Sequence, residues 1–287
     1  MESTKILKNM QELYRDTCLE CSKVITKRYS TSFSLGIRAF DKKYRYPIYA
    51  IYGFVRYADE IVDTFHGFDK KMLLDRYKAE TYLAIDEGIS LNPVLHAFQI
   101  TVNKYNISRD LIDCFLNSME MDLHKLDYDY KTFKQYILGS AEVVGLMCLK
   151  IFCLGDEKLY DQLTPNAMSL GSAFQKINFL RDLKQDYKEM GRSYFPEVDL
   201  DNFDQSTKKM IENDIAKDFA HAMEGIKKLP KSSRIGVYTA YVYYYKLFQK
   251  IVNTPPEKVL KERIRIPDAQ KMYLLLGTYM RHNINML

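Results

Sequence analysis

Two pairs of aspartates have the spacing and chemistry of metal ligands. Asp59 and Asp63 form one pair, and Asp182 and Asp186 form another much later in the chain. Residues four apart on an α-helix lie one turn apart on the same face, so each pair would present two carboxylates side by side. Such oxygen ligands suit Mg²⁺, which in turn binds phosphate. Two helices of this kind facing each other would bind a diphosphate through Mg²⁺ ions.

The residues around each pair favour a cavity over a solvated surface, which is the commoner place for such a spacing. The first pair follows residues 49–58, which are mostly apolar, and Arg56 stands within that run. In the second segment, Gln175 and Asn178 precede Asp182 on one helical face and alternate with Phe, Ile and Leu. An exposed helix face is normally rich in charged residues along its whole length. The pattern therefore predicts two polar strips that line a cavity.

The elements that carry these strips are predicted to be helices. The chain has 287 residues with only 12 Gly and 8 Pro, and its apolar residues recur mostly at helical spacing, as in Ile215, Phe219, Met223 and Ile226. We expect breaks at 40–46, 66–69, 90–93, 155–156, 191–199, 230–233 and 255–256. None is a long low-complexity linker. The sequence predicts an all-α bundle in which residues 1–287 form a single domain.

One segment has conflicting signals. Tyr243, Tyr244 and Tyr245 favour a strand by intrinsic propensity. They lie, however, in a stretch without Gly or Pro from Val237 to Thr254. We predict a helix there.

Charge and hydropathy restrict the classes of partner. A net charge of +5, from 42 basic and 37 acidic residues, is smaller than nucleic-acid binders usually carry, so no nucleic-acid partner is expected. Residues 143–154 are apolar, but Lys150 interrupts them and they are too short to span a membrane. The N-terminus lacks the apolar region of a secretory signal. We expect a cytoplasmic protein; the oligomeric state stays open.

Cysteine and histidine patterns argue against zinc or disulfide chemistry. Five cysteines, an odd number, fit a reducing compartment. Cys18 and Cys21 form a single CxxC with no second ligand pair at zinc-site spacing, and the five histidines are scattered. A zinc hydrolase is therefore not the favoured interpretation.

Residues 52–63 and 175–186 resemble the two aspartate-rich signatures of the squalene and phytoene synthase family. Three supporting segments occur in the family's order: 30–34 resembles its Ser-x-Ser-Phe segment, 136–145 its block ending in Val-Gly, and 191–196 its Gly-Arg-x-Tyr-x-Pro. The resemblance runs from about residue 30 to residue 271 and is most specific where the second signature is followed by 191–196. It implies the all-α isoprenoid synthase fold with a central cavity.

The resemblance also implies a reaction and its metal. Family members join two allylic diphosphates head to head through a cyclopropylcarbinyl diphosphate intermediate, which gives a linear C30 or C40 product. Two or three Mg²⁺ ions would neutralise the departing diphosphate. The metal ligands implied here are Asp59, Glu60, Asp63, Asn178, Asp182 and Asp186. With Tyr52 and Tyr136, whose rings can stabilise cations, the four aspartates are the predicted catalytic residues.

The substrate-binding residues implied by the resemblance are Ser30, Ser32, Phe33, Arg56, Gln175, Asn178, Arg181, Arg263 and Lys271. Ser30, Ser32 and Arg56 would bind the second diphosphate, although the two serines could equally cap a helix or turn. Tyr244 also falls near a family tyrosine position. Glu142 departs from the family pattern, since many relatives have Gly there. Its carboxylate would either change the electrostatics of the cavity or point away from it.

The substrate expected is geranylgeranyl diphosphate, with phytoene as the product. After Phe33 the segment has no further ring on the same predicted helix, and Gly36 leaves space, which favours a deep tunnel. Two alternatives stay open: a squalene or dehydrosqualene synthase acting on farnesyl diphosphate, with NADPH in the squalene case, and a non-catalytic assembly subunit that keeps the fold. Release of an apolar product suggests peripheral contact with a membrane.

Overall fold

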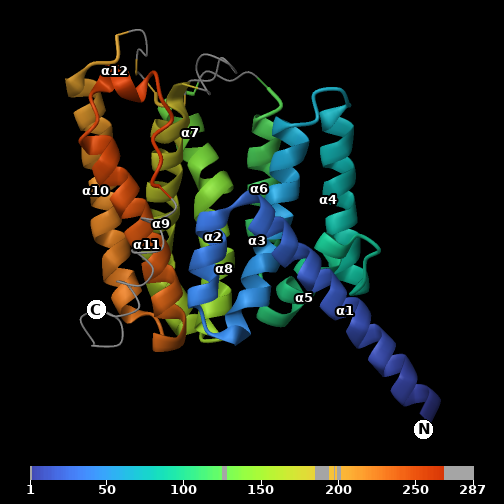
Figure 1. Ribbon diagram of the computed structural model, residues 1–287. Coiled ribbons are helices and arrows are strands. Elements are labelled where there is room, and N and C mark those ends of the chain that lie inside the picture. Colours follow the sequence, from blue (N-terminus) through green and yellow to red (C-terminus); the bar gives the residue numbers. More distant parts are fainter. Residues whose placement is uncertain (1, 125–127, 185–193, 197, 199–201, 268–287) are drawn as a thin grey trace.

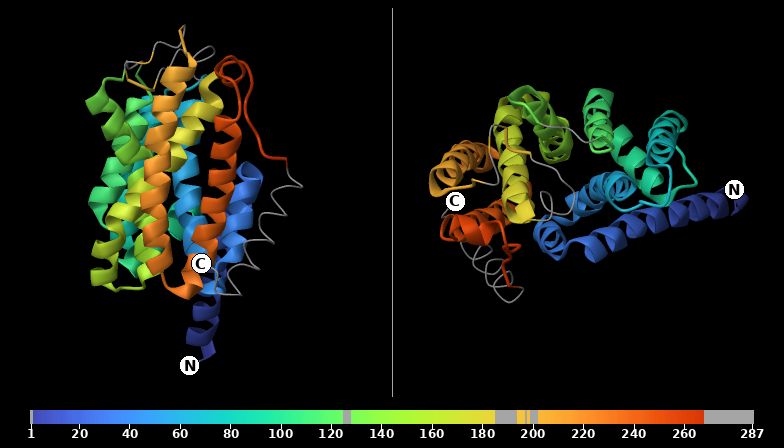
Figure 2. Two further views of the ribbon diagram at one scale, coloured as in Figure 1. Left: turned by 90° about the vertical axis from the view of Figure 1, so that its left-hand side faces the viewer. Right: turned by 90° about the horizontal axis from the view of Figure 1, so that it is seen from above.

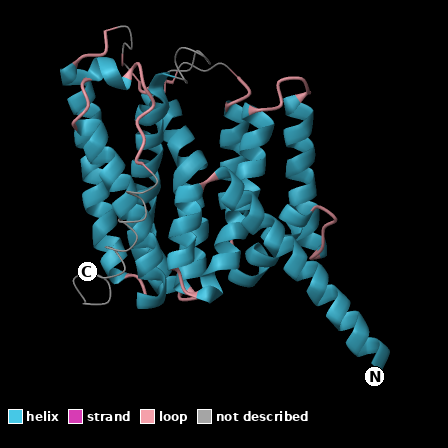
Figure 3. Cartoon of the chain, viewed as in Figure 1, coloured by secondary structure: helices cyan, strands magenta, loops and turns pink. Residues whose placement is uncertain are grey.

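The computed structural model describes residues 2–124, 128–184, 194–196, 198 and 202–267, and every regular element in these ranges is helical (Figure 3). The first half of the chain forms α1 (Glu2–Tyr29), α2 (Thr31–Ala39), α3 (Lys42–Asp63), α4 (Lys70–Glu87), α5 (Pro93–Tyr105) and α6 (Arg109–Met121). The second half forms α7 (Tyr130–Ile137), the π-helical turn η1 (Leu138–Glu142), α8 (Val143–Cys153), α9 (Glu157–Lys184), α10 (Gln205–Lys228), α11 (Lys231–Val252) and α12 (Pro256–Val259).

Most helices run up and down side by side, with α10 and α11 at one side of the bundle and α4 at the other (Figures 1 and 2). The long helix α9 packs against α10 and α8, and α2 packs against α11. The N-terminal end of α1 extends past the other helices (Figure 1). This arrangement brings α3 and α9, which carry the two acidic segments, into one bundle.

A stack of aromatic rings fixes the orientation of α3. Phe54 is fully buried, and its ring lies 3.8 Å from that of Phe98 on α5 at an interplanar angle of 4°. The Phe54 ring also contacts Tyr77 and Phe115, which belong to α4 and α6. Because Phe54 points into this core, residues on another face of α3, among them Asp59, point toward the centre of the bundle.

One continuous helical run, 130–153, contains a turn of π-helix. Residues 138–142 adopt the wider turn between α7 and α8. Small residues allow close packing here: a Cβ added to Gly139 would lie 2.6 Å from the Cys114 carbonyl oxygen, and one added to Gly171 would lie 2.8 Å from the Ala141 oxygen. Substitution of either glycine would push backbones apart.

The same run is long and apolar enough to cross a membrane, with 24 residues and a mean hydropathy of 1.7. Within the protein, however, 56% of its most apolar window is buried. The core helix of a water-soluble bundle meets the same criteria, so length and composition carry little weight here. The apolar stretch 143–154, which is too short by itself to span a membrane, is thus part of a longer helical run than the sequence predicted.

Most predicted breaks coincide with observed connections. The segments 64–69, 88–92, 154–156 and 253–255 lie outside the helices, and the helix predicted around Tyr243 is α11. The break predicted at 40–46 is present but shorter than predicted: only residues 40 and 41 lie between α2 and α3, and α3 begins at Lys42 and continues through Pro47. Burial of Tyr44, Ile48 and Tyr49 stabilises this stretch despite the missing proline donor. The break predicted at 191–199 falls mainly outside the described residues.

Candidate active site

A cavity of about 1110 Å³ lies between the two halves of the bundle. Polar side chains gather toward one end, where α3 and α9 finish, and we call this the acidic end; it includes Asp59, Asp63, Asp122 and Asp182. Apolar side chains line the other end, where α2 and α8 finish and α11 begins, and we call this the apolar end; it includes Phe40, Phe152 and Val237. The volume of the whole cavity exceeds the range of roughly 300 to 1,000 Å³ that is common for small-molecule pockets.

The wall formed by α3 carries the first acidic pair and Arg56. Asp59, Asp63 and Arg56 all line the cavity, at the spacing of one helical face. Arg56 Nη1 lies 3.6 Å from Asp59 Oδ2, and its Nη2 pairs with the carboxylate of Glu60. Glu60 itself is not among the lining residues. The structure therefore places Glu60 as a partner of Arg56, and the prediction that it supports a metal finds no geometric backing.

Like charges crowd around Asp59. The pKa of Asp59 is raised to about 7, mainly by burial. The nearby carboxylates of Asp63 and Asp122 raise this pKa further, whereas Arg56 lowers it. Asp122 follows α6 and also accepts a hydrogen bond of 2.9 Å from the hydroxyl of Tyr136. A carboxylate whose pKa is raised by burial and by neighbouring carboxylates is one that a divalent cation would keep ionised.

Asp122 is a residue that sequence reasoning missed. It has no carboxylate at i+4 in the sequence, so the spacing rule used for the other aspartates could not detect it. Its only local signal is its position directly after a helix whose other face is apolar. The packing of α6 against η1 and α8 brings it to the cavity.

The wall formed by α9 carries the second acidic segment. Gln175, Asn178 and Asp182 line the cavity at successive turns. Two guanidinium groups cover the carboxylate of Asp182: Arg181 Nη2 lies 2.5 Å from Oδ2, and Arg263 Nε lies 2.7 Å from Oδ1. Arg263 belongs to a segment that follows α12 and returns along the cavity. The negative charge of Asp182 is thus compensated by arginines in the structure.

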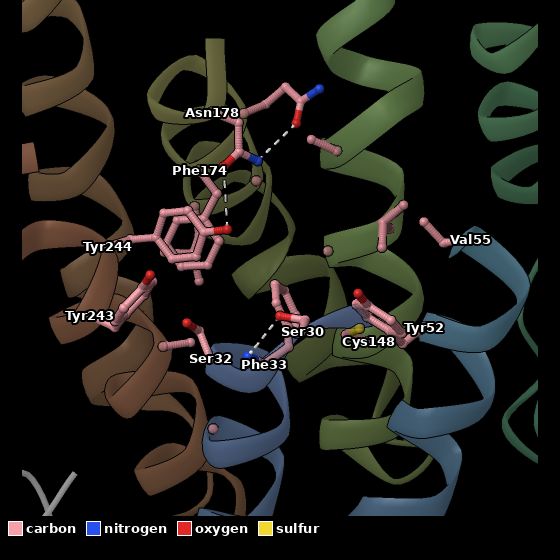
Figure 4. A pocket seen from close by; sticks show the side chains of 18 of the residues that line it. Ser30, Ser32, Phe33, Tyr52, Val55, Cys148, Phe174, Asn178, Tyr243 and Tyr244 are labelled. Carbon is pink, nitrogen blue, oxygen red and sulfur yellow. Dashed lines mark hydrogen bonds between the residues drawn. The ribbon is translucent and has the colours of Figure 1, made fainter. Parts of the chain in front are cut away.

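The start of α2 lies opposite this wall (Figure 4). Ser30 caps α2, because its Oγ accepts a hydrogen bond of 3.1 Å from the Phe33 backbone N–H. Ser32 and Phe33 line the cavity beside it. Arg56 completes the group: its Nε is buried and has no hydrogen-bond partner among the described residues. A buried guanidinium donor without a partner suits an anionic ligand.

Aromatic rings surround the middle of the cavity. Tyr52 contacts Phe33, and burial is the largest cause that raises the pKa of Tyr52 to about 12. Tyr136 stacks with Tyr194, and burial keeps the pKa of Tyr136 well above its ordinary value. Tyr244 lies in the opposite wall, where its hydroxyl lies 3.5 Å from Asn178 Oδ1 (Figure 4). These tyrosines are neutral and can offer ring faces or hydroxyl donors to a ligand.

Thirteen predicted site residues line the cavity: Ser30, Ser32, Phe33, Tyr52, Arg56, Asp59, Asp63, Tyr136, Gln175, Asn178, Arg181, Asp182 and Arg263. Asp186 and Lys271 lie outside the described residues. Phe174, which stacks on Tyr244 at 3.9 Å, and Tyr194 line the cavity as well, although sequence reasoning did not select Phe174 or assign a role to Tyr194.

Glu142 is not among the residues that line the cavity, although Ala141 and Val144 beside it are. Burial is the largest cause that raises the pKa of Glu142 to about 7, and the nearby charge of Asp218 adds to it, while Lys176 opposes it. Lys176 joins α9 to α10 through Asp214 and Asp218, at 2.5 and 2.8 Å. Of the two alternatives left open, the structure favours a carboxylate directed away from the cavity.

The donor set fits magnesium in combination with phosphate. Among the described residues, no three acidic, cysteine or histidine side chains stand close enough to hold a metal ion by themselves. Mg²⁺ in proteins commonly takes only one or two carboxylates and completes its shell with water and substrate phosphate. Asp59, Asp63 and Asp122 on one wall, with Asn178 and Asp182 on the other, supply hard oxygen ligands of this kind around a space open to a diphosphate.

Comparison with known proteins gives the family. Residues 26–270 match the family model described as squalene/phytoene synthase. The chain belongs to this family. Its members act on prenyl diphosphates, so the chain is a prenyltransferase of the squalene/phytoene synthase type, and the reaction it performs is head-to-head prenyl transfer.

Relatives that are named for products of different chain length are about equally similar to this chain in sequence. A phytoene synthase from Arthrospira platensis is 26% identical, with 91% of this chain and 92% of the relative covered. A 4,4'-diapophytoene synthase from Staphylococcus haemolyticus is 27% identical over 66% of each chain. Similarity to relatives at this level gives the reaction type and leaves the substrate length open.

Solved structures of family members share the fold. A dehydrosqualene synthase superimposes with a TM-score of 0.78 at 20% identity, with 93% of this chain and 96% of that chain covered. The squalene synthase HpnC from Alicyclobacillus acidocaldarius gives a TM-score of 0.74 at 20% identity, with 84% and 95% covered. The predicted all-α isoprenoid synthase fold is confirmed.

Proposed function

We propose that the chain condenses two molecules of geranylgeranyl diphosphate to phytoene. The observation that carries this proposal is the polarity of the cavity, which is acidic at one end and apolar along the remaining length. The diphosphates would lie at the acidic end and the prenyl chains along the apolar walls. In the first half-reaction one diphosphate leaves, a carbon–carbon bond forms, and a proton is lost to give the cyclopropylcarbinyl diphosphate. In the second half-reaction the remaining diphosphate leaves, the carbon skeleton rearranges, and another proton is lost.

The chain's own residues would divide the work between two diphosphate positions. Asp59, Asp63 and Asp182, with Asp122 as an additional carboxylate, are positioned to hold Mg²⁺. Bound Mg²⁺ neutralises the negative charge that develops on a departing diphosphate. Arg56, whose Nε is buried without a partner, would donate to the other diphosphate together with Ser32.

The arginines on Asp182 suggest how the site stays neutral before substrate binds. Arg181 and Arg263 both donate to this carboxylate. A guanidinium released from Asp182 would be free to donate to a diphosphate oxygen. Tyr52 and Tyr136 would face the allylic cation, which is stabilised by the negative face of a ring. The apolar walls of the rest of the cavity would exclude water, which would otherwise react with that cation.

The open wall of the cavity at Gly36 supports the C20 substrate. A Cβ added to Gly36, which lines the wall formed by α2, would meet no atom within 4 Å, so the wall is open at this point. Five additional carbons gain roughly 0.8 kcal/mol of burial per CH₂ group. A cavity long enough to bury them would therefore bind the C20 chain more tightly by several powers of ten, before any steric penalty is subtracted. This is the physical basis on which we favour geranylgeranyl over farnesyl diphosphate.

The competing proposal is a C15 enzyme, and the relatives named 4,4'-diapophytoene synthase and dehydrosqualene synthase give it specific support. One experiment separates the two. The protein is incubated with Mg²⁺ and either farnesyl or geranylgeranyl diphosphate, with and without NADPH, and the extracted hydrocarbon is analysed by mass. Phytoene from the C20 substrate without NADPH supports our proposal, whereas a preference for C15 contradicts it. Absence of pyrophosphate release from either substrate would favour a non-catalytic assembly subunit.

We further propose that residues 1–287 form one domain that works in the cytoplasm, with peripheral contact with a membrane when the product leaves. The proposal rests on the packing of the helices around the cavity and on the apolar nature of the product. Fractionation of cells that express the protein, before and after a high-salt wash, would test it. Recovery only in detergent extracts would contradict it.

A further inference from the structure

We propose that Phe40 forms the floor of the cavity and sets the longest prenyl chain that fits, and that Gly236 is the residue that allows it to do so. This inference rests on the proposed function, because it assumes that prenyl chains occupy the cavity. It adds the residue that limits their length. Phe40 directly follows α2, lines the cavity and is 6% exposed.

The Phe40 ring connects the two halves of the bundle at the apolar end. It stacks on Phe152, near the end of α8, with ring centroids 5.0 Å apart and an interplanar angle of 23°. On α11 it lies against Gly236. The lower ends of α2 and α8 and the start of α11 all lie at the end of the bundle opposite the acidic end (Figure 1). The ring therefore closes the cavity where a prenyl tail would terminate.

Gly236 is in contact with the ring itself. A Cβ added at this position would lie 2.3 Å from Phe40 Cδ1 and 2.4 Å from both Cγ and Cε1. Such distances are far below van der Waals contact, so any other residue at 236 would force the ring to move. Gly236 lies within a helix and needs no unusual backbone angle there. Close approach of the ring is thus the reason for a glycine.

The backbone around Phe40 is fixed, which limits where the ring could move. The Phe40 N–H donates to Ile37 O at 3.2 Å, and Arg45 Nε donates to Phe40 O at 2.9 Å. Tyr44, whose ring also contacts Phe40 and Phe152, is fully buried and its hydroxyl lies 2.9 Å from Ser232 Oγ on α11. A methyl group at 236 would push the Phe40 ring away from α11 without moving its backbone. The ring would then occupy space that the cavity now provides.

Gly67 provides a contrast outside the cavity. It is exposed, it is not among the lining residues, and its added Cβ would meet no atom within 4 Å. A methyl group there would not displace Phe40. Gly67→Ala is therefore a control for the replacement of a glycine that does not contact the Phe40 ring.

The test compares wild type with Phe40→Ala, Gly236→Ala and Gly67→Ala. Binding of unreactive thiolodiphosphate analogues with C15, C20 and C25 chains is measured by thermal shift in the presence of Mg²⁺, and products from the reactive diphosphates are analysed by mass. Removing the Phe40 ring should raise the affinity ratio of C25 to C20 at least tenfold. Gly236→Ala should raise the ratio of C15 to C20 at least tenfold. Gly67→Ala should change either ratio less than twofold.

A folded Phe40→Ala protein that binds C25 no better than wild type would overturn the inference, as would equal effects of the two glycine substitutions. If Phe40→Ala does not fold, Phe40→Leu removes the ring while keeping an apolar side chain, and the same tenfold criterion applies. The binding readout separates this inference from the proposed function. A wild type that makes no hydrocarbon defeats the proposed function, whereas the analogue affinities still report whether Phe40 limits chain length.

Discussion

Replacing Asp59 with asparagine should abolish catalysis and stabilise the protein in the absence of metal. The pKa of Asp59 rises from an ordinary value of 3.8 to about 7 in the fold, with burial as the largest cause. Ionising it above pH 7 would cost up to roughly 4 kcal/mol of folding free energy. The side chain is 32% exposed, however, and screening by solvent reduces the figure to about 1 kcal/mol. Asparagine keeps the volume and removes this cost.

The sign of the pH dependence follows from proton binding. Between pH 3.8 and about 7 the folded state holds a proton on Asp59 that the unfolded state has lost, so wild-type stability falls as pH rises through this range. Asp59→Asn should therefore melt about 2–4 °C higher than wild type at pH 8. The gain should become smaller below pH 7 and vanish near pH 4. Thermal melts across this range without Mg²⁺ measure it.

Activity gives the second readout. With Mg²⁺ and substrate, Asp59→Asn should release pyrophosphate more than tenfold slower than wild type, a loss above about 1.4 kcal/mol of transition-state stabilisation. Asp161→Asn, which changes an exposed carboxylate on α9, serves as the control and should alter neither quantity. Turnover above a tenth of wild type would reject Asp59 as a metal ligand. A difference in melting temperature that does not depend on pH would contradict the argument that ionisation of Asp59 destabilises the fold.

Three further predictions concern separate parts of the structure. Arg56→Ala should impair the first condensation more than turnover of the cyclopropyl intermediate supplied directly; equal losses in the two assays would assign Arg56 to the shared ionisation site. Ile37→Phe adds a ring to a buried residue that lines the cavity and should shift the product ratio from C20 toward C15; an unchanged ratio would contradict the tunnel argument. Gly139→Ala would place a Cβ 2.6 Å from the Cys114 carbonyl oxygen and should lower the free energy of unfolding by about 1 to 3 kcal/mol, which denaturant titration measures; full stability would show that η1 can move.

Sequence patterns predicted the helical fold and most of the acidic end, because helical periodicity depends only on residues a few positions apart and is visible in the sequence. Asp59 and Asp63 point to the cavity since they share a face with Tyr52 on α3. Glu60 adjoins them in the sequence but is rotated by roughly 100° from Asp59, and it pairs with Arg56 instead. Adjacency in a motif was therefore a poorer guide than position on the helix face.

Contacts between distant elements account for what the sequence did not reveal. Asp122 reaches the cavity because of how α6 packs, and no spacing rule links it to Asp59. Phe40 was assigned to a break between helices, and its position as a lining residue depends on α8 and α11. Tertiary packing of this kind requires knowledge of which helices are neighbours. A helical pattern alone does not contain it.

The π-helical turn η1 makes the number of residues in 138–142 a structural constraint in its own right. Tyr136, Ser140, Val144, Cys148 and Phe152 all line the cavity at intervals of four along α7, η1 and α8. In a regular α-helix of 3.6 residues per turn, such a row would drift steadily around the axis. The wider turn takes in about one additional residue and brings the row back to the same side. Inserting one more residue into a turn that is already wide would rotate α8 by roughly 100°. The cavity should then lose half of one wall without any change in the side chains of that wall, so the shape of the cavity depends on the length of this segment as well as on its residues.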